Sequence, residues 1–175
     1  THMKKLVTLF VAIFATTALW AFDFVGDNFL CYNITSSSEP YTVEVTCQVS
    51  FSRENYNGIS SFTIPTTVEH NGITYAVTGI DDRAFLNCFA LKSITIPEGI
   101  TNIGTIAFEN CKALTSITIP KNVTHIGGGA FFRCNAMTNF KVAPDNPKYD
   151  SRHNCNALIE SATNKLVYGF ASSIR

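Results

Sequence analysis

The sequence predicts a stacked solenoid of short parallel strands joined by turns or short helices, mainly β or α/β, behind an antiparallel β cap. Three similar segments begin at Ala84, Ala107 and Ala130, each 23 residues after the last in a chain of 175. A tandem period of that length is typical of solenoids, in which each unit stacks on its neighbours. Upstream of the repeats, residues 41–51 alternate between apolar and polar side chains, which is typical of an antiparallel strand with one wet face.

The first half of each repeat reads as a short, half-buried strand. Ile94 and Ile96 alternate with Ser93 and Thr95, so the apolar and polar side chains fall on opposite faces. Pro97 then ends the strand, because proline has no amide proton to continue a ladder of hydrogen bonds. The second repeat has the same pattern, which predicts a turn at this point of every coil.

The second half of each repeat has apolar residues at spacings of three and four, as in Ile103, Ala107, Phe108 and Cys111. These spacings predict a helical or 3₁₀ turn. One unit cannot bury its own apolar side chains, so stacking is expected to be the main source of stability. The predicted core ladder consists of the aligned Phe85, Phe108 and Phe131, together with the isoleucine and leucine rows.

The segments around the repeats complete the predicted organisation. Residues 22–57 form the β cap, and residues 58–148 form the repeats, with a hairpin inserted at 66–77 around Asn71-Gly72. Residues 149–175 form a second hairpin and a truncated further repeat, without a C-terminal cap. Residues 1–2 resemble a cloning scar.

The N-terminal segment, residues 3–21, has the layout of a secretory signal peptide. Lys4-Lys5 precedes an apolar stretch that is too short to span a bilayer comfortably, and small residues follow as far as Ala21. We therefore expect an exported protein, secreted or held at the cell surface or outer membrane of a bacterium. Contact with a membrane is expected only through export or anchoring.

Composition favours a folded chain and disfavours one class of partner. Hydrophobic residues make up 46% of the chain and charged residues 15%, which is enough apolar material for a core. Thirteen basic residues balance thirteen acidic ones, and no basic cluster follows the leader. Nucleic-acid binding is therefore not expected.

Six cysteines in an exported chain raise the question of disulfides. Three of them share one repeat position, and there we expect a structural role: a small side chain inside the coil that can hydrogen-bond the turn backbone. Their Cβ vectors run parallel, which opposes bridging. Cys31 and Cys47 are candidates for a disulfide in the cap, and Cys155 has no evident partner. The three repeat cysteines are Cys88, Cys111 and Cys134.

No pattern in the sequence favours an enzyme, a metal site or a cofactor. His153 and Cys155 are two apart and lack an orienting partner, so a cysteine nucleophile is not expected there. The spacing of the repeat cysteines does not suit zinc. Asp145, Asn146 and Asp150 could hold calcium in a loop, although a turn explains them more simply.

The repeats resemble a known family. The pattern A-F-x-x-C-x-x-L-x-S-I-T-I-P-x-x-I/V-T-x-I-G, which extends over roughly residues 60–144, is similar to the BspA-like leucine-rich repeats of bacterial surface proteins. The third unit departs from it, since Ala143-Pro144 replaces the Ile-Pro step. The resemblance implies a leucine-rich repeat solenoid and cell-surface adhesion, including attachment to host matrix proteins.

In the stacked fold, the polar strand residues between the core positions should form rows about 5 Å apart on one sheet. We expect this face to bind a protein of the host or of a bacterium, with a glycan as the alternative, and the resemblance implies a host matrix protein as the ligand. Exposed aromatic rings would favour glycans, and these positions carry none, which favours a protein. The oligomeric state stays open. The candidate binding residues are Ser93, Thr95, Ser116, Thr118, Asn139 and Lys141.

Overall fold

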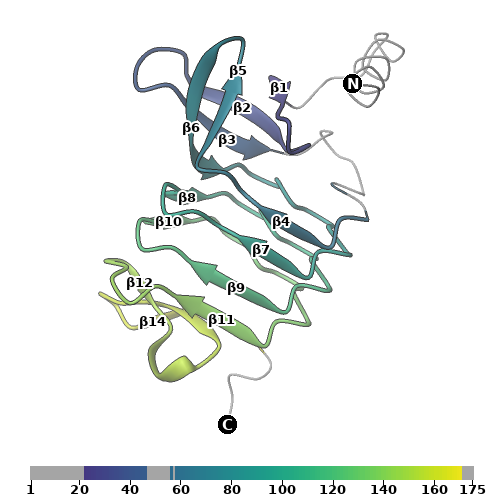
Figure 1. Cartoon of the computed structure of the whole chain (residues 1–175). Coiled ribbons are helices and arrows are strands. Elements are labelled where there is room, and N and C mark those ends of the chain that lie inside the picture. Colours follow the sequence, from purple (N-terminus) through teal and green to yellow (C-terminus); the bar gives the residue numbers. More distant parts are fainter. Residues whose placement is uncertain (1–21, 47–55, 57, 171–175) are drawn as a thin grey trace.

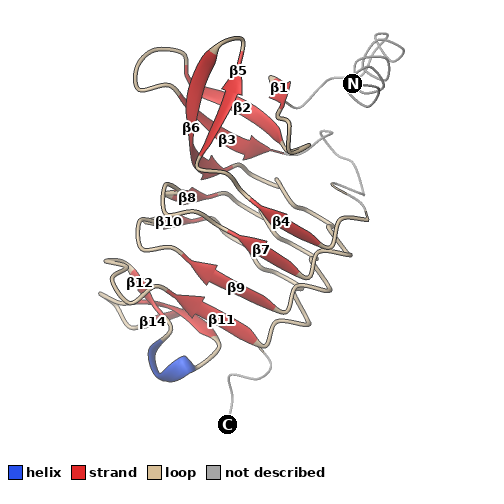
Figure 2. Cartoon of the chain, in the orientation of Figure 1, coloured by secondary structure: helices blue, strands red, loops and turns tan. Residues whose placement is uncertain are grey.

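A computed structural model describes residues 22–46, 56 and 58–170. Within these residues the strands form three sheets, and successive coils lie one above another between a cap at one end and a small sheet at the other (Figures 1 and 2). The leader, Cys47 and the second half of the predicted strand at 41–51 lie outside the described residues. The fold class predicted from the repeats is confirmed.

The four-stranded sheet forms one wall of the solenoid. Its strands are parallel and follow the order β11-β9-β7-β4, so each successive coil adds one strand at the same edge. Buried and exposed residues alternate along them, as the sequence predicts. The strands are β4 (Ser61–Thr63), β7 (Ser93–Thr95), β9 (Ser116–Ile119) and β11 (Asn139–Val142).

The seven-stranded sheet joins the cap to the repeats. On the solenoid side, β6, β8 and β10 are parallel to one another and form the opposite wall of the coils. On the cap side, β1, β2 and β3 are antiparallel, and β3 then pairs in parallel with β6. The strands are β1 (Phe24–Val25), β2 (Cys31–Ser36), β3 (Thr42–Thr46), β5 (Thr67–His70), β6 (Ile73–Ile80), β8 (Asn102–Ile103) and β10 (His125–Ile126).

The cap therefore extends the solenoid's own sheet rather than only covering its first coil. Val43 and Val45 of β3 are fully buried, which agrees with the apolar face predicted for this strand. Between β5 and β6, Asn71 and Gly72 both have positive φ, at 52° and 77°, as a tight two-residue hairpin turn requires.

The helical or 3₁₀ turn predicted in the second half of each repeat is present only as single turns, in which an amide donates to the carbonyl three residues back, as from Cys111 N to Phe108 O at 3.2 Å. Within the described residues the repeats contain turns, and the one helical element is a 3₁₀ segment, η1 (Arg152–Asn154), beyond the third repeat. Each turn has left-handed residues at two places, such as Ile106 (φ 62°) and Asn110 (φ 64°), which interrupt a right-handed helix. Other turn amides pair with the next coil, as from Phe108 N to Ala130 O at 2.7 Å.

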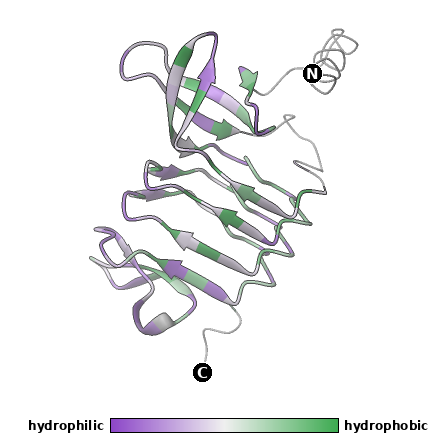
Figure 3. Cartoon of the chain, viewed as in Figure 1, coloured by the Kyte–Doolittle hydropathy of each residue, from purple (hydrophilic) through white to green (hydrophobic). Residues whose placement is uncertain are grey.

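The phenylalanine ladder predicted from the alignment lies at the centre of the solenoid. Phe85, Phe108 and Phe131 are at most 2% exposed. Neighbouring ring centroids lie 5.1 and 5.5 Å apart, with the planes within 2° and 4° of parallel. Hydropathy shows the same division, with apolar residues alternating with polar ones along the strands (Figure 3). Burial of each ring contributes about 1.5–3 kcal/mol to stability.

Two glycines allow the coils to approach closely. A Cβ atom on Gly104 would lie 2.5 Å from the backbone nitrogen of Asp82, and one on Gly127 would lie 2.4 Å from that of Thr105. Real Cβ atoms do not come so near to backbone atoms, so any larger residue would force neighbouring coils apart.

The C-terminal segment forms the hairpin that the sequence predicts. The three-stranded sheet packs against the third repeat: Phe170 stacks on Phe140 with centroids 5.1 Å apart, and the Tyr168 ring meets Phe131 edge-on. The Tyr168 hydroxyl also donates a hydrogen bond to the carbonyl of Gly127 at 3.3 Å. The strands are β12 (Tyr149–Asp150), β13 (Ala157–Glu160) and β14 (Lys165–Gly169).

Candidate binding face

The six candidate residues lie on the outer face of the four-stranded sheet. The buried residues between them hold this orientation, because Ile94, Ile117 and Phe140 point into the core from the same strands. Ser116 is half-buried and the other five candidates are exposed. The structure therefore brings Ser93, Thr95, Ser116, Thr118, Asn139 and Lys141 to one surface.

Strand register places these residues in rows across the sheet. Ser93 pairs with Ser116, and Ser116 pairs with Asn139. Lys141 pairs with Thr118. Neighbouring members of a row are therefore about 4.8 Å apart, the spacing of adjacent strands.

Two further residues extend the rows and were missed in the sequence. Ser61 and Thr63 on β4 pair with Ser93 and Thr95, and both are exposed. The signal was present, since Phe62-Thr63-Ile64-Pro65 repeats the strand-and-proline step, but the inserted hairpin separates this strand from the regular units. We call the eight-residue surface, Ser61, Thr63, Ser93, Thr95, Ser116, Thr118, Asn139 and Lys141, the polar face.

The hydroxyl groups of this sheet fall into two sets. Thr115 and Thr138, just before β9 and β11, donate hydrogen bonds to carbonyls of the preceding coil at 3.3 Å. Thr95 and Thr118 have no hydrogen-bond partner for their hydroxyls among the described residues. Their donors and acceptors are available to a ligand, and Lys141 adds the one charge on the polar face.

Exposed aromatic rings lie elsewhere. Phe89 and Phe132 are 40% and 54% exposed, and both belong to the turns of the coils rather than to the four-stranded sheet. A cation covers each ring: Lys112 Nζ lies 5.4 Å from the centroid of Phe89, and the guanidinium of Arg133 lies 5.2 Å from that of Phe132. The polar face itself has no aromatic residue on which a sugar ring could stack.

The repeat cysteines have the structural role that their position predicts. Cys111 Sγ donates to the carbonyl of Phe85 at 3.2 Å, and Cys134 Sγ donates to that of Phe108 at 3.1 Å, each reaching back one coil. Both thiols are buried. Contact with the Cys111 thiol, together with burial, raises the pKa of the Cys134 thiol above its usual range, which disfavours the reactive thiolate.

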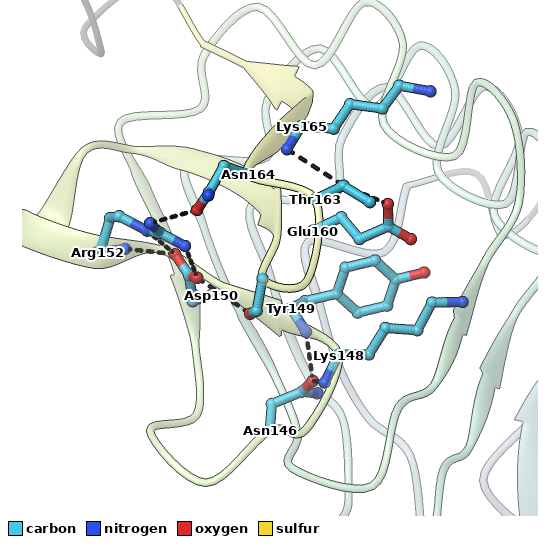
Figure 4. A network of polar contacts seen from close by, with 10 residues as sticks. Asn146, Lys148, Tyr149, Asp150, Arg152, Glu160, Thr163, Asn164 and Lys165 are labelled. Atoms are coloured by element: carbon cyan, nitrogen blue, oxygen red, sulfur yellow. Dashed lines mark hydrogen bonds and ion pairs between the residues drawn. The ribbon is translucent and has the colours of Figure 1, made fainter.

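The polar side chains near the C-terminal sheet form hydrogen bonds and an ion pair with other protein groups (Figure 4). Asn146 is buried and donates to the carbonyls of Pro120 and Val123, both at 2.9 Å. Asp150 is paired with Arg152, whose hydrogen bonds lower the pKa of that carboxyl to about 2. Asn146 and Asp150, which the sequence left open as calcium ligands, are thus engaged with protein groups. Among the residues described, no cluster of three or more His, Cys, Asp or Glu could hold a metal ion.

The described part of the chain contains no helix with the length and apolar character that crossing a membrane requires.

Comparison with solved structures found bacterial leucine-rich repeat proteins. One from Bacteroides ovatus ATCC 8483 is 26% identical, with a TM-score of 0.44, over 71% of this chain and 42% of that protein. One from Bacteroides capillosus ATCC 29799 is 22% identical, with a TM-score of 0.46, over 68% and 97%. A leucine-rich cell surface protein from Faecalibacterium prausnitzii A2-165 is 18% identical, with a TM-score of 0.35, over 82% and 59%.

This chain thus spans less than half of the Bacteroides ovatus protein and 59% of the Faecalibacterium prausnitzii protein. Comparison with curated proteins found no match. A family model described as the BspA type leucine rich repeat region (6 copies) matches residues 58–163, which is more than half of the chain. Together with the coils, the phenylalanine ladder and the parallel sheets, this match shows that the chain belongs to the BspA-type leucine-rich repeat family.

Proposed function

We propose that this chain is an exported or surface-exposed binding protein, adhesin-like, that holds a protein ligand on the polar face and performs no catalysis. The observation that carries the proposal is the set of outward hydroxyl, amide and ammonium groups on successive strands, in register and backed by a continuous core. Membership of the leucine-rich repeat family supports a binding role, because such repeats typically form binding surfaces.

The chemistry of the polar face favours a protein over a glycan. Sugars commonly stack on aromatic rings, and the exposed phenylalanine rings of the described residues, Phe29, Phe89 and Phe132, lie outside the polar face. Ser, Thr, Asn and Lys offer hydrogen bonds to the backbone and side chains of a polypeptide. The family resemblance adds a host matrix protein as the first candidate partner.

A direct test is to measure binding of the purified chain to immobilised fibronectin, laminin and collagen, and to cellulose, chitin and mannan. The test variant replaces Thr95, Thr118 and Lys141 with alanine. The control variant replaces Thr66, Lys121 and Thr124, which are exposed residues outside the polar face. We expect the test variant to lose at least about tenfold in affinity for one of the proteins, and the control to bind normally.

Three outcomes would count against this proposal. If the test variant binds as the parent does, the ligand does not use the polar face. If only polysaccharides bind, the carbohydrate-binding alternative is favoured. If nothing on the panel binds, adhesion to these host polymers is rejected.

A further inference from the structure

β11 is the last strand of the four-stranded sheet, so one of its edges does not pair with another strand of that sheet. Asn139 N donates to Thr115 O at 3.1 Å and Ala143 N donates to Ile119 O at 2.9 Å, so these alternate amides face β9. The amides of Phe140 and Val142 consequently point away from β9. Unsatisfied amides on an edge strand are a template for pairing with another strand.

Two side chains from the C-terminal segment accept these amide protons. Phe140 N donates to Asn156 Oδ1 at 2.6 Å, and Val142 N donates to Ser151 Oγ at 2.9 Å. Asn156 Nδ2 in turn donates to the carbonyl of Met137 at 3.1 Å. Asn156 is 5% exposed, so this bond to Phe140 is made away from water.

The repeats show what these side chains replace. Ile64, one residue beyond β4, has the same repeat position as Val142 and donates its amide proton to the carbonyl of Thr95 in the next coil at 3.1 Å. At Val142 the acceptor is the Ser151 hydroxyl. The side chain therefore occupies the place of a backbone carbonyl that another coil would supply.

We propose that Asn156 and Ser151 form an edge seal that prevents β11 from pairing with a strand of a second copy of this chain. A second copy suits the unsealed edge because its strands carry the matching alternation of polar and buried residues, as Ser61-Phe62-Thr63 does. Such pairing would be head to tail and would not close on itself, so the product would be an open assembly.

The seal can be removed without losing the anchors of the C-terminal segment. Asn146 holds that segment to Pro120 and Val123, and Phe170 stacks on Phe140; neither contact involves the two seal side chains. The test variant is therefore the double substitution Asn156→Ala and Ser151→Ala. Thr163→Ala is the matched control, because Thr163 lies in the same segment and bonds Glu160 rather than β11.

Two measurements on the whole chain test the seal. Amide hydrogen exchange in dilute solution should be about tenfold faster at Phe140 and Val142 in the double variant, and unchanged in the control. Sedimentation over a series of concentrations should show a mean mass that rises further with concentration in the double variant than in the parent and control.

Each alternative result overturns the proposal. Unchanged exchange would show that the two side chains do not protect the edge. Fast exchange with the mass of the parent at every concentration would show that protection is not what keeps copies apart. If circular dichroism shows that the double variant is unfolded, Ser151→Ala alone is used: faster exchange at Val142 only, with a smaller rise in mass, supports the seal, and neither change rejects it.

Discussion

At the scale of single residues, asparagines at one repeat position form a ladder of side-chain hydrogen bonds that includes the first two coils but not the third. Asn110 Nδ2 donates to Asn87 Oδ1 at 2.7 Å, one coil back. The Oδ1 atom of Asn110 is itself buried without a hydrogen-bond partner among the described residues. The third coil has Arg133 at the equivalent position, with left-handed φ (60°) and its guanidinium over Phe132. A buried acceptor without a hydrogen-bond partner lowers the stability of the folded state. The left-handed backbone is also unfavourable for arginine.

We therefore expect Arg133→Asn to stabilise the protein by about 1 kcal/mol, because asparagine tolerates the left-handed backbone and can donate to Asn110. Arg133→Gly is the control: it removes the strain and the contact with Phe132 equally, but it cannot extend the ladder. Urea unfolding of both variants measures the difference. Equal midpoints for the two variants would show that the ladder bond adds nothing.

At the scale of elements, Glu44 lies where the cap strand β3 joins the repeats. A bulge shifts the register there, so that Val43 faces Val77 and Glu44 faces Gly79. Burial, then the charges of Asp81 and Asp82, raise the pKa of the Glu44 carboxyl to about 7. The carboxyl is consequently protonated in the folded protein over a range in which the unfolded chain has lost that proton.

This shift makes stability depend on pH in a defined direction. Between about pH 4.5 and pH 7 the folded state binds the extra proton, so stability is highest below this window and falls as pH rises through it. After allowance for solvent screening, the loss is about 1–2 kcal/mol. Glu44→Gln should flatten this part of the profile, measured by urea unfolding at several pH values. The lowered pKa of Asp150 changes stability only below about pH 4, so this carboxyl does not contribute to the slope between pH 4.5 and pH 7. A Gln variant with the slope of the parent would contradict the assignment.

The elements also show how far the sequence could predict the fold. The strand-and-proline step and the Asn71-Gly72 turn are local patterns, and both appear in the structure. The apolar spacing predicts a helical or 3₁₀ turn, but it does not show that these turns stop short of a regular helix. The left-handed conformation at Ile106 that stops them has no local signal, because isoleucine rarely adopts it. Two other contacts join segments that do not follow each other in sequence: β3 pairs in parallel with β6, and Asn156 bonds β11. The spacing of apolar residues along the chain does not predict such contacts.

At the scale of the whole molecule, aromatic rings form one continuous column from the cap side to the C-terminal segment. Successive centroids lie between 5.1 and 5.6 Å apart along it. Each coil contacts only its neighbours, so the coils at the two ends are coupled in unfolding only through the rings in the middle of the column. In order, its members are Tyr56, Phe62, Phe85, Phe108, Phe131, Phe140 and Phe170.

A gap in the middle of this column should therefore matter more than one at its end. We expect Phe108→Ala to cost about 3–5 kcal/mol and to lower the steepness of urea unfolding, because the coils on either side of Phe108 no longer unfold as one unit. Phe170→Ala, at the end of the column, should cost less and leave the steepness unchanged. Urea unfolding followed by both circular dichroism and tyrosine fluorescence distinguishes the two cases. Equal costs with coincident, equally steep transitions would mean that the coils are coupled through the sheets and turns rather than through the aromatic column.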